Sequence, residues 1–391
     1  MGHTRLPGTP RLLRALNDRA ALDLLISRGP LTRAQLGELT GLSKVTASQL
    51  VERLEQSGLV TRVGEQAGGR GPNAQLYAVR PGSAHVVGVD VGPDRVVAAC
   101  ADITGAVVGR VEQSTRDSDD PLGVVHNAVV QAAGSAQAQL ATVRRVVLGT
   151  PGLVDPGTGD ITFAYNLPRW QRGLLAALRD DLTTTVVFEN DVNLAAVAEA
   201  DVGAARGVDD FVLVWLSAGL GLAVVLGGRL HRGSSGAAGE IGYLPVPGAQ
   251  ITRDASRRAK PPFQQLAGAD AVRAVAREHG FRSASAADAV RAAIAAGTAG
   301  GPMLDEVARR LALGVASTCV VLDPPLVVLA GEVGQAGGAA LAERVQHEVA
   351  AITLVSPRVV ATGVPDEPVL RGALRTSLDA VRDEVFGSTV G

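Results

Sequence analysis

Two carboxylates beside turns have the clearest capacity for chemistry in this sequence. Asp191 follows the strand-like run "TTVVFEN" and opens the helical pattern "DVNLAAVAEA", where a carboxylate either caps the helix or acts as a general base. The position by itself favours the cap. Glu240 stands between two glycines in "GEIG", which begins a stretch, residues 239–263, that resembles a ligand-binding loop at its start and a basic, solvated segment at its end.

Three glycine-bearing turns accompany these carboxylates. They are "DVG" at residues 90–92, "SAGLGLAVV" at 217–225 and "PPLVVLAGEVG" at 324–334. In a nucleotide-binding cleft such turns bring backbone N–H groups to phosphates. Glycine-rich β-turns are common, however, so none of the three establishes a ligand site by itself.

The elements that must position these residues follow an α/β pattern that occurs twice. "HVVGVDVG", "RVVAACADI" and "AVVGRVEQS" indicate three short strands, followed by a helix over residues 122–141, the strand "RRVVLGT", the loop "PGLVDPGTGDI" and a strand that runs into a helix at Asp191. "DFVLVWLSAGLGLAVVLGGRLHRG" restarts the three-strand pattern about 120 residues after its first appearance, which predicts a duplicated lobe. Two such lobes leave a cleft where ligands bind.

The first 80 residues have a different pattern. A helical repeat ends at Gly29-Pro30, a short helix follows with Thr32 as its cap, and a third helix runs from the N-cap Ser43 to Gly58. The runs 59–63 and 75–79 alternate like strands around a glycine-rich tip. This order predicts a winged helix-turn-helix. We expect the third helix to bury Val45, Ala47, Leu50, Val51 and Leu54.

Charge supports a nucleic-acid partner for this first domain. Residues 1–80 hold 11 Lys and Arg against 6 Asp and Glu, whereas the whole chain has a net charge of −2. The third helix would enter the major groove and Arg70, at the hairpin tip, the minor groove. A protein-binding domain of the same shape is the alternative, and simple solvent exposure explains Thr46 and Gln49 equally well. The predicted DNA-contacting residues are Ser43, Lys44, Thr46, Gln49, Arg53 and Arg70.

Bulk composition excludes several classes of protein. A chain of 391 residues with 46% apolar residues is long enough for two or three domains. Cys100 and Cys319 are isolated, so neither a disulfide framework nor a cysteine zinc site is expected. We find no signal peptide and no charge-free apolar run of about 18 residues. The sequence therefore predicts a soluble, cytoplasmic protein without a membrane partner.

Six motifs together resemble the ROK family (repressors, open reading frames, kinases), in particular its xylose- and N-acetylglucosamine-type repressor branch. In chain order they are "GVDVG", "LGTPGLVDPGTGDI", "NLPRW", "VVFENDVNLAAVAEA", "LHRGSSGAAGEIG" and "VVLAGEVG". The resemblance covers nearly the whole chain. It implies an α/β protein with a winged helix-turn-helix at residues 1–80 and a two-lobed, actin-like ATPase (sugar kinase) body. Lobe one would span 83–205, completed by a C-terminal helix at 367–387, and lobe two 206–366.

The resemblance also implies roles for single residues. In family kinases the aspartate of the Asn-Asp pair deprotonates the sugar 6-hydroxyl, and that position is Asp191 here. The family's sugar-contacting glutamate corresponds to Glu240, and the histidine three residues later, which binds zinc and sugar, is replaced by Tyr243. The "TPG" loop and the "NLPxW" motif supply a glycine and an asparagine. The sugar site implied in this way consists of Gly152, Asn166, Asn190, Asp191, Glu240 and Tyr243.

Departures from the family pattern imply a site without metal or catalysis. The CxCGxxGCxE zinc cluster is replaced by "VPGAQITRDASRRAKPPF", so we expect no metal and no other cofactor. The phosphate loop DxGGTK reads "DVGPDR", in which Pro93 lacks an N–H donor and Asp94 adds negative charge. Ser217 begins "SAG" where kinases have Gly-Thr-Gly, and only Gly331 remains of a glycine pair. We therefore predict that Asp191 is a vestigial base and that the protein is not an enzyme.

The preferred hypothesis is a transcription regulator, most simply a repressor, whose body senses a sugar or sugar derivative. Ligand binding would close the cleft, reorient the winged helices and change the affinity for a DNA operator. A homodimer or homotetramer on a palindromic operator fits, because one small head buries too little surface for tight specific binding. The alternatives are a sugar kinase with an appended DNA-binding head and a regulator whose body only dimerises or binds a protein.

Overall fold

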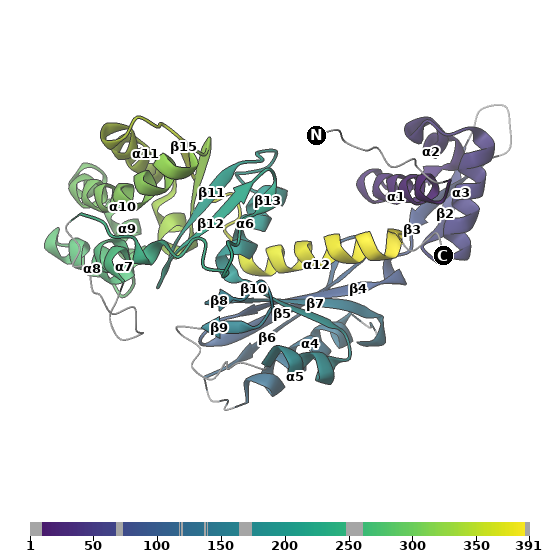
Figure 1. The fold of residues 1–391 in the computed structure, drawn as a ribbon, viewed down its shortest axis with the longest axis horizontal. Helices are drawn as coiled ribbons and strands as arrows, with labels where there is room; N and C mark the ends of the chain where they lie inside the picture. The colour runs from purple at the N-terminus through teal and green to yellow at the C-terminus, as the bar shows by residue number, and fades with distance from the viewer. Residues whose placement is uncertain are drawn as a thin grey trace.

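The computed structural model describes residues 10–67, 73–116, 118, 120–136, 138, 140–163, 174–247 and 261–387. Within these residues a small head lies at one end of the molecule and two sheet-centred lobes form the body (Figure 1). No helix in the described part of the chain has both the length and the apolar character to cross a membrane.

The head has the predicted winged-helix order. Helices α1 (Pro10–Arg28), α2 (Arg33–Thr40) and α3 (Lys44–Gln56) accompany a sheet with the order β1 (Leu31–Thr32), β3 (Ala74–Val79), β2 (Val60–Gln66). Thr32 caps α2 in a capping box with Gln35, and Ser43 caps α3 by accepting a hydrogen bond from the Thr46 N–H. The predicted caps are therefore confirmed. The tip of the wing, including Arg70, lies outside the described residues.

The two lobes repeat one sheet topology, as the sequence pattern predicts. Lobe one has the strand order β10-β7-β4-β5-β6 and lobe two the order β15-β14-β11-β12-β13. In each, the first strand lies at the centre, antiparallel to the second and parallel to the fourth. The strands of lobe one are β4 (His85–Val91), β5 (Arg95–Asp102), β6 (Val107–Ser114), β7 (Val143–Thr150) and β10 (Thr185–Asn190). Those of lobe two are β11 (Phe211–Leu216), β12 (Leu220–Leu226), β13 (Arg229–Leu230), β14 (Leu326–Ala330) and β15 (Arg358–Ala361).

Helices cover the outer faces of both sheets. In lobe one the outer face packs against α4 (Pro121–Ser135) and α5 (Leu174–Leu182). In lobe two it packs against α7 (Pro262–Ala267), α8 (Ala269–Glu278), α9 (Ala286–Ala295), α10 (Gly301–Leu322) and α11 (Gly331–Ile352).

Two sequence-based boundaries in lobe one were wrong. The helix predicted over 122–141 ends at Ser135, because Gly134 and Ser135 are poor helix formers, and a 3-10 turn (Leu140–Thr142) follows. The segment "PGLVDPGTGDI", predicted as a loop, contains a short hairpin of β8 (Leu153–Val154) and β9 (Ile161–Phe163). The Asp155 carboxylate organises its turn by accepting from the N–H groups of Gly157 and Thr158.

Two helices lie between the sheets and join the lobes. Helix α6 (Asp191–Val202) packs against both sheets, and α12 (Pro368–Gly387) runs along α6 and across lobe one toward the head (Figure 1). Glycines permit the close approach, since a Cβ on Gly372 of α12 would lie 1.9 Å from the Leu194 carbonyl oxygen of α6. The backbones of α6 and of α12, the helix that runs toward the head, are thus in direct contact.

The head and lobe one share one hydrophobic core. Leu22 and Leu25 of α1 belong to the same buried cluster as Val97 of β5 and Val381 and Phe386 of α12. The short connection between head and body is also hydrogen-bonded, with the Ile103 N–H donating to the Pro81 carbonyl. The head is therefore packed on the body, not only tethered to it.

Candidate functional site

Asn190 connects β10 to α6 at the edge of the lobe-one sheet. It is the N-cap of α6, and its Oδ1 accepts from the N–H groups of Val192 (3.0 Å) and Asn193 (3.2 Å). Its Nδ2 donates to the Gly152 carbonyl at 3.0 Å, which holds the predicted "TPG" loop against the start of the helix. Gly152 has φ +122, a backbone conformation that favours glycine. Two predicted site residues are therefore brought together by one side chain.

The capping interpretation of Asp191 was wrong. Asn190, with extended backbone angles, occupies the cap position, and Asp191 is the first residue of the helix itself. The Asp191 Oδ1 accepts from the adjacent Val192 N–H at 2.9 Å. The capping role therefore belongs to Asn190 and not to Asp191.

The charge of Asp191 acts on two other carboxyl groups, those of Asp90 and Glu240. Burial raises the pKa of Asp191 to about 6. Burial and the nearby charge of Asp191 raise the pKa of Asp90, at the end of β4, to about 7. Desolvation and again Asp191 raise the pKa of Glu240 from lobe two. Burial and nearby like charge both favour the protonated form of a carboxyl group, which is why these pKa values lie above their usual range.

The raised pKa of Asp90 predicts a pH-dependent stability. Between the usual value of 3.8 and about 7 the folded protein holds a proton that the unfolded chain releases, so the cost of this carboxyl grows as pH rises through that window. We expect Asp90→Asn to increase the free energy of unfolding at pH 8 by on the order of 2 kcal/mol, which raises the melting temperature by a few degrees. At pH 5 the increase should be smaller.

Thermal denaturation of both proteins from pH 5 to pH 8.5 measures this difference. Asp94→Asn is the matched control, because Arg116 lowers the pKa of this exposed aspartate and its loss should not stabilise the protein. A constant difference between Asp90→Asn and the wild type across the pH range would contradict the assignment.

A loop of lobe two, residues 231–240, reaches across to lobe one. It leaves and rejoins β12, where His231 N–H donates to the Val224 carbonyl and Leu222 N–H to the Gly239 carbonyl. Between these points Gly236, at φ +78, lies so close to lobe one that a Cβ would be 2.1 Å from the Val154 carbonyl oxygen. The backbones of the two lobes are therefore in close contact at this point.

Glu189 and Arg232, which the sequence analysis did not single out, lock this loop in place. The nearly buried Glu189 accepts from Arg232 Nε at 2.7 Å through Oε2, and from Asn193 Nδ2 at 2.9 Å through Oε1. Both residues lie inside the motifs "ENDVN" and "LHRGSSGAAGEIG", but nothing local indicates that a residue 43 positions away is the partner.

Glu240 is the last residue of this loop, and Tyr243 belongs to the 3-10 turn (Ile241–Tyr243) that follows it. The Tyr243 N–H donates to the Glu240 carbonyl at 3.1 Å, and the Tyr243 side chain is exposed. The charge of Asp191 in lobe one acts on the Glu240 carboxyl group in lobe two. The remaining predicted contact, Asn166, and residues 248–260 of the replaced zinc tract lie outside the described residues.

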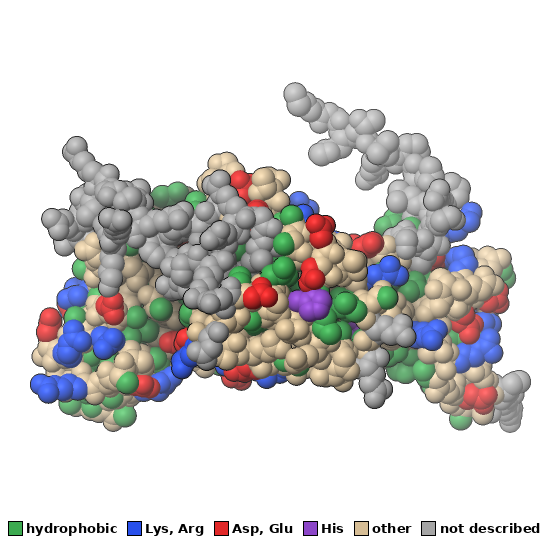
Figure 2. Space-filling model, turned by 90° about the horizontal axis from the view of Figure 1, so that it is seen from below, with side chains coloured by type: hydrophobic (Ala, Val, Ile, Leu, Met, Phe, Trp, Pro, Cys, Tyr) green, Lys and Arg blue, Asp and Glu red, His purple; other side chains and the backbone are tan. Residues whose placement is uncertain are grey.

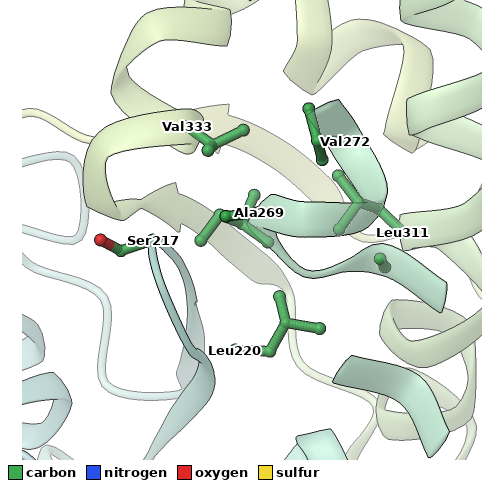
Figure 3. Close-up of a pocket in the computed structure, with 8 residues that line it drawn as sticks. Ser217, Leu220, Ala269, Val272, Leu311 and Val333 are labelled. Atoms are coloured by element: carbon green, nitrogen blue, oxygen red, sulfur yellow. The ribbon is translucent and has the colours of Figure 1, made fainter. Parts of the chain in front are cut away.

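The turns that would meet a nucleotide are engaged with protein groups. Asp94 pairs with Arg116 at 3.1 Å, and the Thr115 hydroxyl donates to the Pro93 carbonyl at 2.8 Å. In lobe two the Ser217 N–H donates to the Gly219 carbonyl at 3.1 Å. Beside Ser217 a pocket lined by Leu220, Ala269, Val272, Leu311 and Val333 is apolar and leaves no space for a water molecule (Figure 3). The Ser217 hydroxyl points away from these apolar side chains (Figure 3).

The predicted DNA-contacting residues of the head divide into two groups. Lys44 and Gln49 are exposed on α3 and form no hydrogen bond or ion pair with a described residue. Ser43 and Thr46 instead bond to each other, hydroxyl to hydroxyl at 2.9 Å, within the helix cap. Arg53 pairs with the fully buried Asp18 of α1 at 2.6 Å, which fixes α3 on α1.

Val45 does not occupy the buried face predicted for it. Its side chain is 68% exposed, whereas Ala47, Leu50, Val51 and Leu54 are buried as expected. The spacing from Val45 to Leu54 does not fit the 3.6-residue repeat of the other four positions.

Lys and Arg side chains are also visible over the head, at the right of Figure 2.

Comparison with known proteins gives two family matches. A model described as the ROK family matches residues 86–377, and one described as the MarR family matches residues 16–71. The chain is 28% identical over 242 residues to the xylose repressor of Bacillus subtilis (strain 168), covering 60% of this chain and 61% of that protein. It is 27% identical over 241 residues to the DNA-binding transcriptional dual regulator NagC of Escherichia coli (strain K12), covering 61% of this chain and 59% of that protein. The chain thus spans about three fifths of the length of these curated relatives.

Solved structures show the same architecture. A ROK family transcriptional regulator, a homologue of the E. coli MLC protein, superposes with a TM-score of 0.75 over 97% of this chain and 99% of that chain, at 20% identity. The ROK hexokinase from Thermus thermophilus has a TM-score of 0.64 and 27% identity over 76% of this chain and 99% of that chain. The first likeness spans nearly the whole chain, and the second spans about three quarters of it.

Proposed function

The chain belongs to the ROK family, and from that premise we propose that it is a DNA-binding transcriptional regulator, acting as a repressor, whose operator affinity is set by a sugar or sugar derivative in the cleft. The observation that carries this proposal is the continuous packing from the cleft to the head. Helix α6 begins at Asp191, lies against α12, and α12 ends in the core that it shares with α1. Such a regulator would work in the cytoplasm.

The cleft chemistry supports a polyhydroxyl ligand. Asp191 and Glu240 offer carboxyl oxygens from opposite lobes and Gly152 offers backbone groups, which suit the hydroxyl groups of a sugar. We include Asn166 and Tyr243 in this site by their motif positions, whereas Asn190 acts chiefly by holding Gly152 and the start of α6. A ligand bridging the lobes gains contacts only when the cleft is closed.

The link from the cleft to the head consists of specific pairs. Asp201 near the end of α6 pairs with Arg375 of α12 at 2.5 Å. Asp383 near the end of α12 pairs with Arg19 of α1. The adjacent residue, Asp18, holds Arg53 of α3 at 2.6 Å. A movement of α6 on ligand binding would therefore shift α12, α1 and α3 together, which gives the two sites a coupling free energy.

We further propose that the body has no kinase activity and that Asp191 is a vestigial base. Supporting this, the β4–β5 turn contains Pro93 and is occupied by the Asp94–Arg116 pair. Phosphoryl transfer requires donors positioned around the phosphates. The alternative, an active sugar kinase with an added head, predicts ATP-dependent phosphorylation of hexoses that Asp191→Asn abolishes.

For DNA binding we propose Lys44 and Gln49 as the exposed α3 contacts and Arg70 as the wing contact. Ser43 and Thr46 would help by fixing the start of the helix, and Arg53 by fixing its packing. A dimer on a palindromic operator supplies two such heads. The corresponding division of the chain is residues 1–80 for the head, 83–205 with 367–387 for lobe one, and 206–366 for lobe two.

The test measures operator binding by the full chain across a panel of sugars, amino sugars and glycosides, with thermal stabilisation as a second readout. We expect one class of sugar to raise the melting temperature and change the operator Kd. Asp191→Asn should weaken that sugar about 10- to 100-fold, because a charged hydrogen bond is lost, while basal DNA binding persists.

Asp209→Asn is the matched control, since Asp209 is exposed at a lobe-two turn away from the cleft. It should leave the sugar affinity unchanged. If no sugar alters either readout, the sensing half of the proposal is wrong, and if hexoses are phosphorylated, the kinase alternative is correct.

A further inference from the structure

Val45 is an apolar side chain that the head leaves largely exposed. It is the second residue of α3 and 68% exposed, although it belongs to a helix whose other aliphatic residues are buried. Exposed single hydrophobic residues are ordinary on protein surfaces. The importance of this one comes from the surface on which it lies.

Most polar groups around the start and end of α3 are already used within the head. The hydroxyls of Ser43 and Thr46 bond to each other, Arg53 is held by the buried Asp18, and Glu52 lies 3.9 Å from Arg33. The exposed positions at the start of the helix that lack such partners are Lys44, Val45 and Gln49, with the half-buried Ser48 between them. Residues 44, 45, 48 and 49 share one face of a helix.

The face therefore contains one positive charge, one amide and one branched apolar group. In helix-turn-helix proteins the first residues of the second helix are those that reach base edges in the major groove. Lys44 can approach a phosphate or a guanine, and Gln49 can form paired hydrogen bonds with adenine. Val45 has no polar atom on its side chain, so it can recognise only an apolar group on a base edge.

We propose that Val45 is a specificity-determining residue that contacts the C5-methyl group of a thymine in each operator half-site. Thymine is the one base that presents a methyl group in the major groove. Gln49 lies one helical turn further on, about 6 Å along the axis, which is roughly two base-pair steps. The α3 face is thus suited to a half-site in which a thymine and an adenine lie within about two base pairs of each other. This inference rests on the proposed DNA-binding function.

The experiment begins with the full chain and a randomised duplex pool, from which the operator is selected. Each thymine is then replaced by deoxyuridine, symmetrically in both half-sites, which removes the methyl group and nothing else. Fluorescence anisotropy at one fixed salt concentration gives the Kd of each duplex. At one thymine we expect the wild-type protein to bind about fourfold more weakly per half-site, the value for removing one buried methyl group from an apolar contact.

The variant Val45→Ala identifies the partner of that methyl group. It should bind the thymine operator more weakly than the wild type by a similar factor and be insensitive to deoxyuridine at that single position. Val107→Ala is the matched control, since Val107 lies in β6 of lobe one and is 57% exposed. It should leave the Kd of every duplex unchanged, and both variants should melt like the wild type.

The possible results separate this inference from the function on which it depends. If Val45→Ala weakens thymine and deoxyuridine duplexes equally, or if no thymine methyl affects the wild type, the methyl contact is disproved while operator binding stands. If the pool yields no enriched sequence, the proposed DNA-binding function fails and the inference fails with it.

Discussion

Glu199→Ala should lower the free energy of unfolding by about 3–5 kcal/mol, because it removes the buried carboxylate that accepts hydrogen bonds from both connections between the two lobes. Glu199 is fully buried in α6. Its carboxylate accepts from the N–H groups of Ala204 (2.7 Å), Gly363 (3.0 Å) and Val364 (3.1 Å) and from the Thr362 hydroxyl. Helix α6 leads from lobe one into lobe two, and residues 362–367 lead back to α12. One carboxylate therefore ties both crossings together, and alanine would leave several buried donors without an acceptor.

Urea denaturation followed by circular dichroism measures the loss. Glu199→Gln keeps one acceptor oxygen and should fall between the alanine variant and the wild type. Glu343→Ala is the control, because Glu343 is exposed on α11, and such surface changes shift stability by about 0.5 kcal/mol or less. An alanine variant at 199 as stable as the one at 343 would show that the joint is held by other contacts.

Phe386→Ala should disconnect the head from the sensing body. The ring is fully buried at the end of α12, in the core shared with α1, and the Arg19 guanidinium lies 5.8 Å from its centre. Truncating a buried phenylalanine costs about 3–5 kcal/mol. Because this contact joins two parts, we expect the head to undock while each part stays folded. Operator binding without sugar should persist, and the change in operator Kd on adding the sugar should largely disappear.

The measurement is the ratio of operator Kd values with and without the sugar. Leu178→Ala is the matched control, since Leu178 is fully buried between α5 and the far face of the lobe-one sheet. It should destabilise the protein while keeping the response to sugar. A full response in Phe386→Ala would show that coupling does not run through α12.

Local patterns predicted the fold well because they act over a few residues. The caps at Thr32 and Ser43, the strand pairs of both lobes and the repeated topology all follow from side-chain period and turn chemistry. The boundary errors, such as the end of α4 at Ser135, occurred where weak helix formers left the choice to neighbouring elements.

The residues of the candidate site remain a prediction from their motifs, and the structure adds how some of them are held. Asp191 and Glu240 stand out by their motifs, yet the cap is Asn190, and burial by surrounding elements raises both carboxyl pKa values. Val45 lies on the face of α3 opposite the buried one, because its spacing from Ala47 and Leu54 does not fit the 3.6-residue repeat.

The sequence by itself determined the winged helix and the duplicated lobes, because hydrophobic period, caps and turns are properties of short segments. The tertiary structure alone decided the connections: Asp18 with Arg53, 35 residues apart, Glu189 with Arg232, 43 apart, and Glu199 with Gly363, 164 apart. These pairs engage Arg53 and Arg232 within the protein, so they decide which charged side chains are left to bind a ligand or DNA. They form only when packed elements bring distant residues together, since electrostatic and hydrogen-bond energies depend on distance in space and not along the chain.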